Sequence, residues 1–158
     1  MTTRLEAAKH MISRCLRLRN EGKPEAVLRS ELSSRLRQMF PGKNDELWVN
    51  HYTEGTEAAT RIARRDGGLS NRFVDNLIRS TVIEYEPDLR ITSRWQQGYQ
   101  QVREYAAGII RSGTQVSQVL GILSDTIDWH VFDVKLSGRT ISTNCSPDDI
   151  QLTEIECL

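Results

Sequence analysis

The chain has 158 residues and a formal net charge of zero, and 27% of its residues are charged, as in an ordinary soluble domain. No apolar run approaches the ~20 residues of a membrane span, and the N-terminus lacks the apolar core of a secretory signal. We therefore expect no membrane association. The cysteines are odd in number and have no zinc-like spacing, which favours the reducing cytoplasm; they are Cys15, Cys145 and Cys157.

Positive charge is concentrated at the start of the chain. Residues 1–40 contain nine Lys or Arg and four acidic residues, and the whole chain has seventeen Arg and four Lys. The planar guanidinium of Arg suits bidentate contacts with phosphate. The zero net charge argues against a surface that binds nucleic acid everywhere. The basic segment is therefore either part of a DNA-facing surface or a set of solvated helix faces.

Two helices are expected at the N-terminus, over residues 2–20 and 24–40. Apolar residues recur at helical spacing in both. Pro24 suits the first turn of the second helix, and Pro41-Gly42 ends it. We interpret residues 1–42 as a helical pair appended to the rest of the domain. It serves as a DNA contact, a scaffold or a dimer surface.

A third helix is predicted over residues 45–65, with a weak point at Gly55. Its apolar residues are Leu47, Trp48, Tyr52, Ala58, Ala59 and Ile62. On this helix Glu57 lies four residues before Arg61, the spacing of an exposed ion pair on a helix surface.

Two short strands rich in β-branched and aromatic residues follow, over residues 73–78 and 81–85. Only Arg79-Ser80 separates them, which favours a tight antiparallel hairpin. Pro87 ends the second strand. Polar side chains near the end of this strand can therefore be accessible to a substrate.

Three carboxylates lie on these strands or at their end. Side chains alternate across a strand, so Glu84 and Glu86 point to one face. Two adjacent acids repel each other unless a proton or a cation lies between them. With Asp75 from the neighbouring strand, they form a set of oxygen ligands suited to Mg²⁺. Alternatively, all three face solvent and pair with arginines such as Arg72, Arg79 or Arg90.

The clearest helical periodicity starts at Thr92 or Ser93, either of which can cap the helix, and ends before Gly113. Its apolar residues are Trp95, Tyr99, Val102, Ala106 and Ile109.

Strands are predicted at 119–123 and 129–134, around a turn at 125–128. A strand, helix, strand order favours a right-handed crossover onto one sheet. That crossover would place Gln101 and Tyr105, four residues apart on one helix face, near the acidic strands. Alternatively, both are polar residues of the helix surface. After Gly138 the sequence pattern is weak. It predicts an edge strand at 140–143 and a short helix over 146–155.

A family resemblance follows from these motifs. The pattern on these strands is Asp75, a spacer of eight residues, and Glu84-Tyr-Glu86. It resembles the active-site strands of the PD-(D/E)xK, or restriction-endonuclease-like, nuclease superfamily. Gln101-Val-Arg-Glu-Tyr105 is similar to the Gln-x-x-x-Tyr signature on the next helix of many members.

The resemblance covers roughly residues 43 to 135 and implies an α/β (α+β) core, with a central mixed β-sheet flanked by helices. The expected organisation is the helical pair (1–42), a nuclease-like core (43–136) and a C-terminal extension (137–158).

The resemblance implies a metal-dependent DNA endonuclease of a restriction or DNA-processing type. Mg²⁺, or Mn²⁺ as a substitute, would be held by Asp75 and Glu84, with the backbone carbonyl of Tyr85 as a further ligand. Many members carry an acidic residue on the helix before the active-site strands, which makes Glu57 a candidate further ligand. Glu86 stands where the family usually has Lys, so it would act as a general base or as a ligand of a second metal ion.

In the same resemblance, Gln101 would position water or phosphate. Tyr105 would hydrogen-bond the DNA backbone or pack beneath the site.

The expected partners are double-stranded DNA, a second copy of the chain, and a methyltransferase or specificity subunit. An alternative is a catalytically silent nuclease-fold module that binds DNA or a partner protein. A third hypothesis is an all-helical regulator with a small β-insert.

Overall fold

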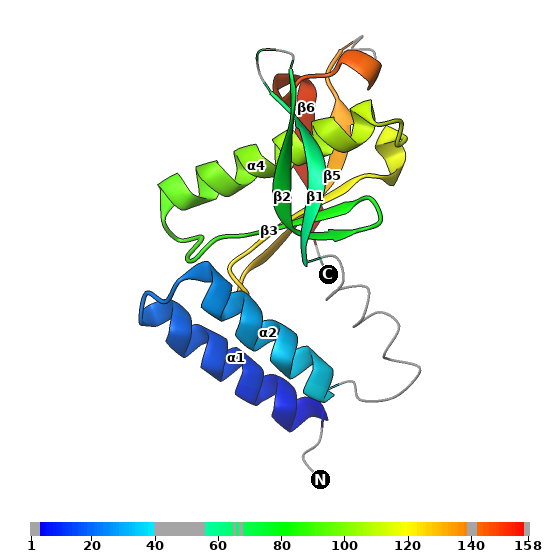
Figure 1. Cartoon of the computed structure of the whole chain (residues 1–158). Helices are drawn as coiled ribbons and strands as arrows, with labels where there is room; N and C mark the ends of the chain where they lie inside the picture. Colours follow the sequence, from blue (N-terminus) through cyan, green and yellow to red (C-terminus); the bar gives the residue numbers. More distant parts are fainter. Residues whose placement is uncertain (1–3, 40–55, 65, 67, 139–141, 157–158) are drawn as a thin grey trace.

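The computed structural model describes residues 4–39, 56–64, 66, 68–138 and 142–156 of the chain (Figure 1). In these residues six strands form one sheet in the order β1-β2-β3-β4-β5-β6. The helices are α1 (Arg4–Asn20), α2 (Glu25–Met39) and α4 (Thr92–Arg111), with the 3₁₀ turns η1 (Val116–Gln118), η2 (Ser142–Asn144) and η3 (Pro147–Asp149). The strands are β1 (Thr56–Ala63), β2 (Leu69–Ile78), β3 (Thr81–Tyr85), β4 (Leu120–Ser124), β5 (Trp129–Leu136) and β6 (Ile150–Glu154).

The sheet is mixed because one pair of neighbouring strands is parallel and the other pairs are antiparallel. β3 and β4 are parallel, with Ile83 paired to Ile122, and α4 connects them. The remaining neighbours are antiparallel. A mixed sheet flanked by helices was expected. The hairpin and the crossover helix were predicted, and β3, β4 and β5 lie close to their predicted bounds, whereas β2 begins at Leu69, four residues before its predicted start. The all-helical hypothesis is wrong.

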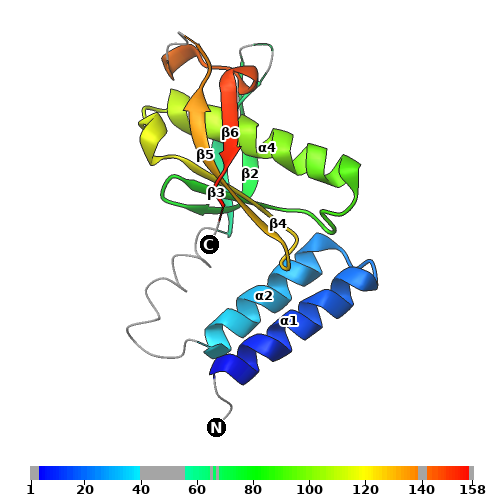
Figure 2. The same cartoon turned by 180° about the vertical axis from the view of Figure 1, so that it is seen from behind.

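Helices cover the two faces of the sheet unequally. Val82 on β3 belongs to a core cluster with Ala106 and Ile110 of α4. The next residue, Ile83, points the other way and packs with Leu32 of α2, as alternation along a strand requires. The helical pair lies beyond one end of the sheet, while α4 lies across the strands on one face (Figures 1 and 2). None of the described helices is long and apolar enough to cross a bilayer.

A buried ion pair joins the helical pair to the turn between β4 and β5. Arg19, near the end of α1, lies 2.8 Å from Asp125 and 2.7 Å from Asp128. Asp125 also accepts a hydrogen bond from the backbone N–H of Leu89. Because Arg19 and Asp125 are buried, the charge of each compensates for the water that the other has lost.

The prediction of a helix over residues 45–65 is wrong for residues 56–63, which the structure describes as a strand. Residues 56–63 form β1, which pairs with β2, for example Ala59 with Phe73; residues 45–55 lie outside the described part. Thr56, Thr60 and Ile62 are β-branched and favour a strand. A ladder with a neighbouring strand outweighs a local helical pattern.

The C-terminal predictions are also corrected. The expected helix over 146–155 is only the turn η3, followed by β6, where Ile150 pairs with Leu136. The expected edge strand over 140–143 is not formed at 142–143, which belong to η2; residues 140–141 lie outside the described part. The N-cap of α4 is Ile91, without a side-chain cap, so the predicted capping by Thr92 or Ser93 is wrong.

Candidate functional site

The candidate site lies where β2 and β3 stop pairing. Their ladder ends at the pair Asn76 and Ile83. Beyond it, Oδ2 of Asp75 accepts a hydrogen bond of 2.8 Å from the backbone N–H of Tyr85. The Asp75 carboxylate thus takes the place of a ladder partner and holds the two strands together at this point.

The first two turns of α2 bring two further ionisable residues, Glu25 and Arg29, to Asp75. Arg29 donates from Nη1 to Oδ1 of Asp75 at 2.6 Å and lies 3.7 Å from Oε1 of Glu25. Glu25 in turn donates a hydrogen bond to Asp75. The helix can begin here because Pro24 suits a first turn, and an acid is favourable at a helix N-terminus.

Glu84 and Glu86 are buried, at 4% and 3% exposure, so the interpretation of these two acids as solvent-facing residues is wrong. Gln101 of α4 donates from Nε2 to Oε1 of Glu84 at 2.7 Å. Nη1 of Arg94 lies 3.8 Å from Oε2 of Glu86. The crossover therefore places Gln101 against an acidic strand, as predicted.

Burial is the largest cause of the abnormal protonation of Glu84. It raises the pKa of Glu84 to about 9, and the negative charges of Asp75, Glu25 and Glu86 add to this rise. The backbone N–H of Asp75 opposes it. At neutral pH Glu84 therefore holds a proton unless a cation replaces it.

The other acids of the cluster are shifted in the same direction. Burial raises the pKa of Glu25 and of Glu86 to about 7; Arg29 opposes the rise at Glu25, and Arg94 opposes it at Glu86. Burial also raises the pKa of Asp75, against the hydrogen bond from Tyr85 and the charge of Arg29. Four carboxyl groups thus share one poorly solvated region with too little positive charge.

Tyr105 packs beneath the site. It is 2% exposed, and its hydroxyl donates to the backbone carbonyl of Phe73 at 2.7 Å. Burial, followed by the charge of Glu84, raises its pKa. Because its only donor is engaged by β2, Tyr105 supports the strand that carries Asp75 and is not a residue of the helix surface.

Glu57 lies on β1, not on a helix. Its neighbours Thr56 and Ala58 pair with Asn76 and Val74, so its backbone is opposite Asp75. Its side chain is outside the described part. The acidic residue that a helix brings to the site is Glu25, which sequence reasoning missed. The only local sign was the sequence Pro24-Glu25 at a helix start.

The oxygen atoms of the site are chemically suited to bind a hard cation. Oε2 of Glu84 and Oε1 of Gln101 are buried without a hydrogen-bond partner, and carboxylate and amide oxygens are the ligands that Mg²⁺ prefers. Within the described ranges, however, no three His, Cys, Asp or Glu side chains are placed as ligands of one ion. Arg29 occupies one oxygen of Asp75 instead.

Comparison with protein-family models, with curated proteins and with solved structures finds no match to this chain. The interpretation of the site therefore depends on the geometry and chemistry of its own residues.

Proposed function

We propose that the chain is a metal-dependent DNA endonuclease with a restriction-endonuclease-like core. One observation carries the proposal: Asp75 and Glu84, on adjacent strands whose ladder ends at this point, lie with Gln101 in a largely buried, oxygen-rich region. The carboxyl groups there outnumber the nearby arginines, Arg29 and Arg94. Asp75 and Glu84 would hold Mg²⁺, or Mn²⁺ as a substitute, and Gln101 would keep the Glu84 carboxylate oriented.

The bound ion would polarise the phosphate and lower the pKa of a ligated water. Glu86, with a pKa of about 7, is suited to accept the proton of the attacking water near neutral pH. The water oxygen bonds to phosphorus as one phosphorus–oxygen bond of the backbone breaks, and the leaving oxygen takes a proton from solvent. Arg29 would supply the positive charge that Glu86 cannot.

Double-stranded DNA is the proposed substrate. A second copy of the chain would supply an active site for the second strand. A methyltransferase or specificity subunit, fused or separate, would select the recognition sequence. Both described cysteines, Cys15 and Cys145, are free and buried, which supports a reducing compartment such as the cytoplasm.

The test is cleavage of supercoiled plasmid in Mg²⁺ or Mn²⁺, together with calorimetric titration of the metal. We expect wild type to cut and to bind the metal, and Glu84→Gln to lose both. Glu104→Gln is the matched control, because Glu104 lies on α4 and pairs with Arg72 on the surface. Equal cleavage by wild type and Glu84→Gln would contradict the proposal.

The second candidate is a catalytically silent module that binds DNA or a protein. The ion pair between Arg29 and Asp75 favours it, since an internal cation already occupies an expected ligand. A silent module would bind DNA, neither cut it nor bind Mg²⁺, and be unaffected by Glu84→Gln.

A further inference from the structure

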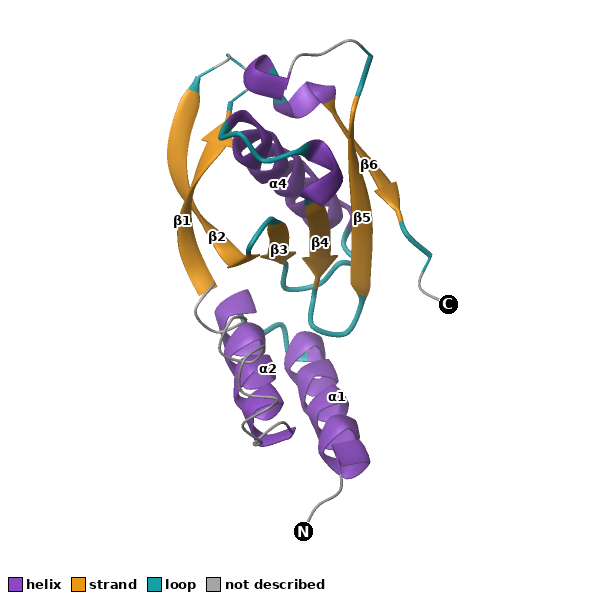
Figure 3. Ribbon diagram, turned by 90° about the vertical axis from the view of Figure 1, so that its right-hand side faces the viewer, coloured by secondary structure: helices purple, strands orange, loops and turns teal. Residues whose placement is uncertain are grey.

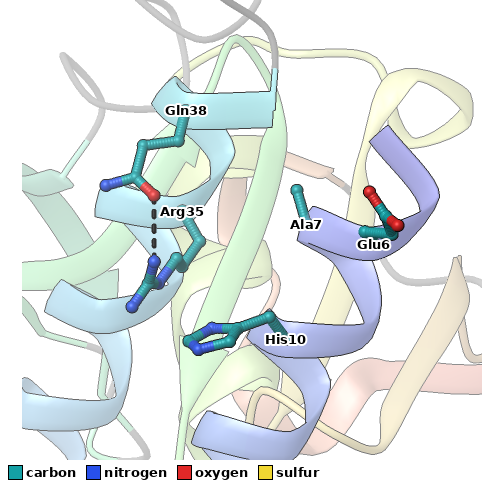
Figure 4. A pocket seen from close by; sticks show the side chains of 5 residues that line it. All are labelled: Glu6, Ala7, His10, Arg35 and Gln38. Carbon is teal, nitrogen blue, oxygen red and sulfur yellow. Dashed lines mark hydrogen bonds between the residues drawn. The ribbon is translucent and has the colours of Figure 1, made fainter. Parts of the chain in front are cut away.

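A groove on the helical pair lies away from the candidate site. Two cavities that share His10 form it. The larger, about 580 Å³, opens between α1 and α2 (Figure 4), and the smaller, about 290 Å³, continues along α1. The larger is lined by Glu6, Ala7, His10, Arg35 and Gln38, and the smaller by His10, Ser13, Arg14 and Arg17.

The residues from α1 form one helix face. His10, Arg14 and Arg17 follow the spacing i, i+4, i+7, so their side chains lie above one another along the helix. Cys15 and Leu18 are buried, so packing uses other positions of the helix. At 1.5 Å per residue the polar face extends about 10 Å, which is long enough to contact more than one phosphate.

This face has more positive than negative charge. Arg14 and Arg35 share a single acid, Glu31, at 3.9 Å and 2.8 Å. Arg17 has only a loose contact of 3.9 Å with Glu21, and both side chains are largely exposed. Such exposed pairs are weak, so the Arg17 guanidinium is available to an anion. Arg14 and Arg35 are partly exposed, at 34% and 29%, and the single charge of Glu31 cannot neutralise both.

Among the described residues, Glu6 is the only acid that lines the larger cavity. It lies at the opposite end from Arg17, because it precedes His10 by one turn of α1. The positive charges of the groove are therefore Arg14 and Arg17, which follow His10 on α1, and Arg35 of α2, which lies opposite His10 (Figure 4).

We propose that this groove binds the phosphate backbone of DNA, through Arg14, Arg17 and Arg35 with His10 and Ser13 as further polar contacts. Arg forks match phosphate oxygens, and such contacts carry no sequence information. The helical pair projects from the end of the sheet (Figure 3), so it adds contact surface outside the core. The inference goes beyond the proposed hydrolysis, since this binding needs no metal and no acidic cluster.

The test is fluorescence anisotropy of a labelled DNA duplex with the full chain in EDTA, over a range of salt concentrations. We expect Arg14→Gln/Arg17→Gln to bind about tenfold more weakly at 0.1 M salt. Its slope of log K against log salt should be lower by about two, because each lost phosphate contact removes about 0.9. Arg37→Gln is the matched control: Arg37 is exposed on α2 and lines neither cavity.

Two further measurements separate the alternatives. Arg14→Lys/Arg17→Lys should restore most of the slope, because it keeps both charges. Polyglutamate, an anion without phosphate, should compete poorly. If the Gln pair binds like Arg37→Gln while its circular dichroism and melting match wild type, or if polyglutamate competes as well as DNA, the proposal is overturned. Because EDTA excludes metal chemistry, neither result bears on whether the acidic cluster cuts DNA.

Discussion

Gln101 of α4 and Glu84 of β3 are joined by a hydrogen bond of 2.7 Å between a side-chain amide and a carboxyl oxygen. This bond connects the crossover helix to the strand that carries the most perturbed acid of the site. The other carboxyl oxygen of Glu84, Oε2, and the amide oxygen of Gln101, Oε1, are buried without a hydrogen-bond partner. The site therefore has fewer hydrogen-bond partners than its buried polar atoms require.

Gln101→Ala should lower the free energy of unfolding by about 1–3 kcal/mol in EDTA, because it leaves a buried carboxyl oxygen unpaired. Urea denaturation measures the loss. The matched control is Gln97→Ala, one turn earlier on the same helix at a surface cavity, which should stay within about 0.5 kcal/mol of wild type. Equal losses in the two variants would show that the bond contributes nothing.

Without metal, the protein should be more stable at pH 5 than at pH 8. The pKa of Glu84 is about 9 in the folded protein and 4.5 ordinarily. Between these values the folded state binds more protons than the unfolded state, so the free energy of unfolding falls as pH rises. One such group contributes up to about 1.4 kcal/mol per pH unit.

Urea denaturation in EDTA from pH 5 to 9 measures this slope. Glu84→Gln cannot titrate and should flatten it. Since Glu25 and Glu86 each have a raised pKa of about 7, they should leave a smaller slope that ends near pH 7. A stability that rises with pH in wild type would contradict the raised values.

Arg29→Gln should separate metal binding from cleavage. Its guanidinium lies 2.6 Å from an oxygen of Asp75, so a metal ion competes with it for that oxygen. We expect the variant to bind Mg²⁺ at least as tightly as wild type in calorimetry, yet to cut plasmid at least tenfold more slowly, because charge on the phosphate is less stabilised. Arg29→Lys should recover part of the rate.

Arg19→Ala should be among the most destabilising substitutions, with a loss of about 3–5 kcal/mol, because it leaves the buried Asp125 without its cation. Chemical denaturation measures the loss. Arg17→Ala, two residues earlier on the exposed side of α1, is the control and should stay within about 0.5 kcal/mol of wild type. A small loss at Arg19 would mean that the contact between the helical pair and the β4–β5 turn does not stabilise the fold.

Gly98→Ala should destabilise the protein, although alanine favours a helix by about 1 kcal/mol over glycine. A Cβ at Gly98 would collide with Leu123 and lie 3.0 Å from Cγ of Glu86. Overpacking of this kind costs about 1–3 kcal/mol. In a Leu123→Ala background the same substitution should cost much less, which thermal or urea unfolding of the four variants of the cycle can measure.

Much of the fold follows from local patterns in the sequence. The two apolar segments separated by Arg79-Ser80 form the predicted hairpin. The segment with apolar periodicity over residues 95–109 lies in α4, as predicted. Both signals depend on side-chain direction along one element. The same reasoning failed at residues 56–63, where pairing with β2 overrides a helical spacing of apolar residues.

The sequence by itself determined that Asp75 and Glu84 lie on paired strands and that Gln101 would approach them, because alternation along a strand and a strand, helix, strand order can be recognised within one segment of the chain. Only the tertiary structure brought Glu25 and Arg29 to Asp75. That contact exists because Leu32 of α2 packs with Ile83, forty or more residues away in sequence. Packing between distant segments depends on the shapes of both surfaces, and no spacing within either segment records it.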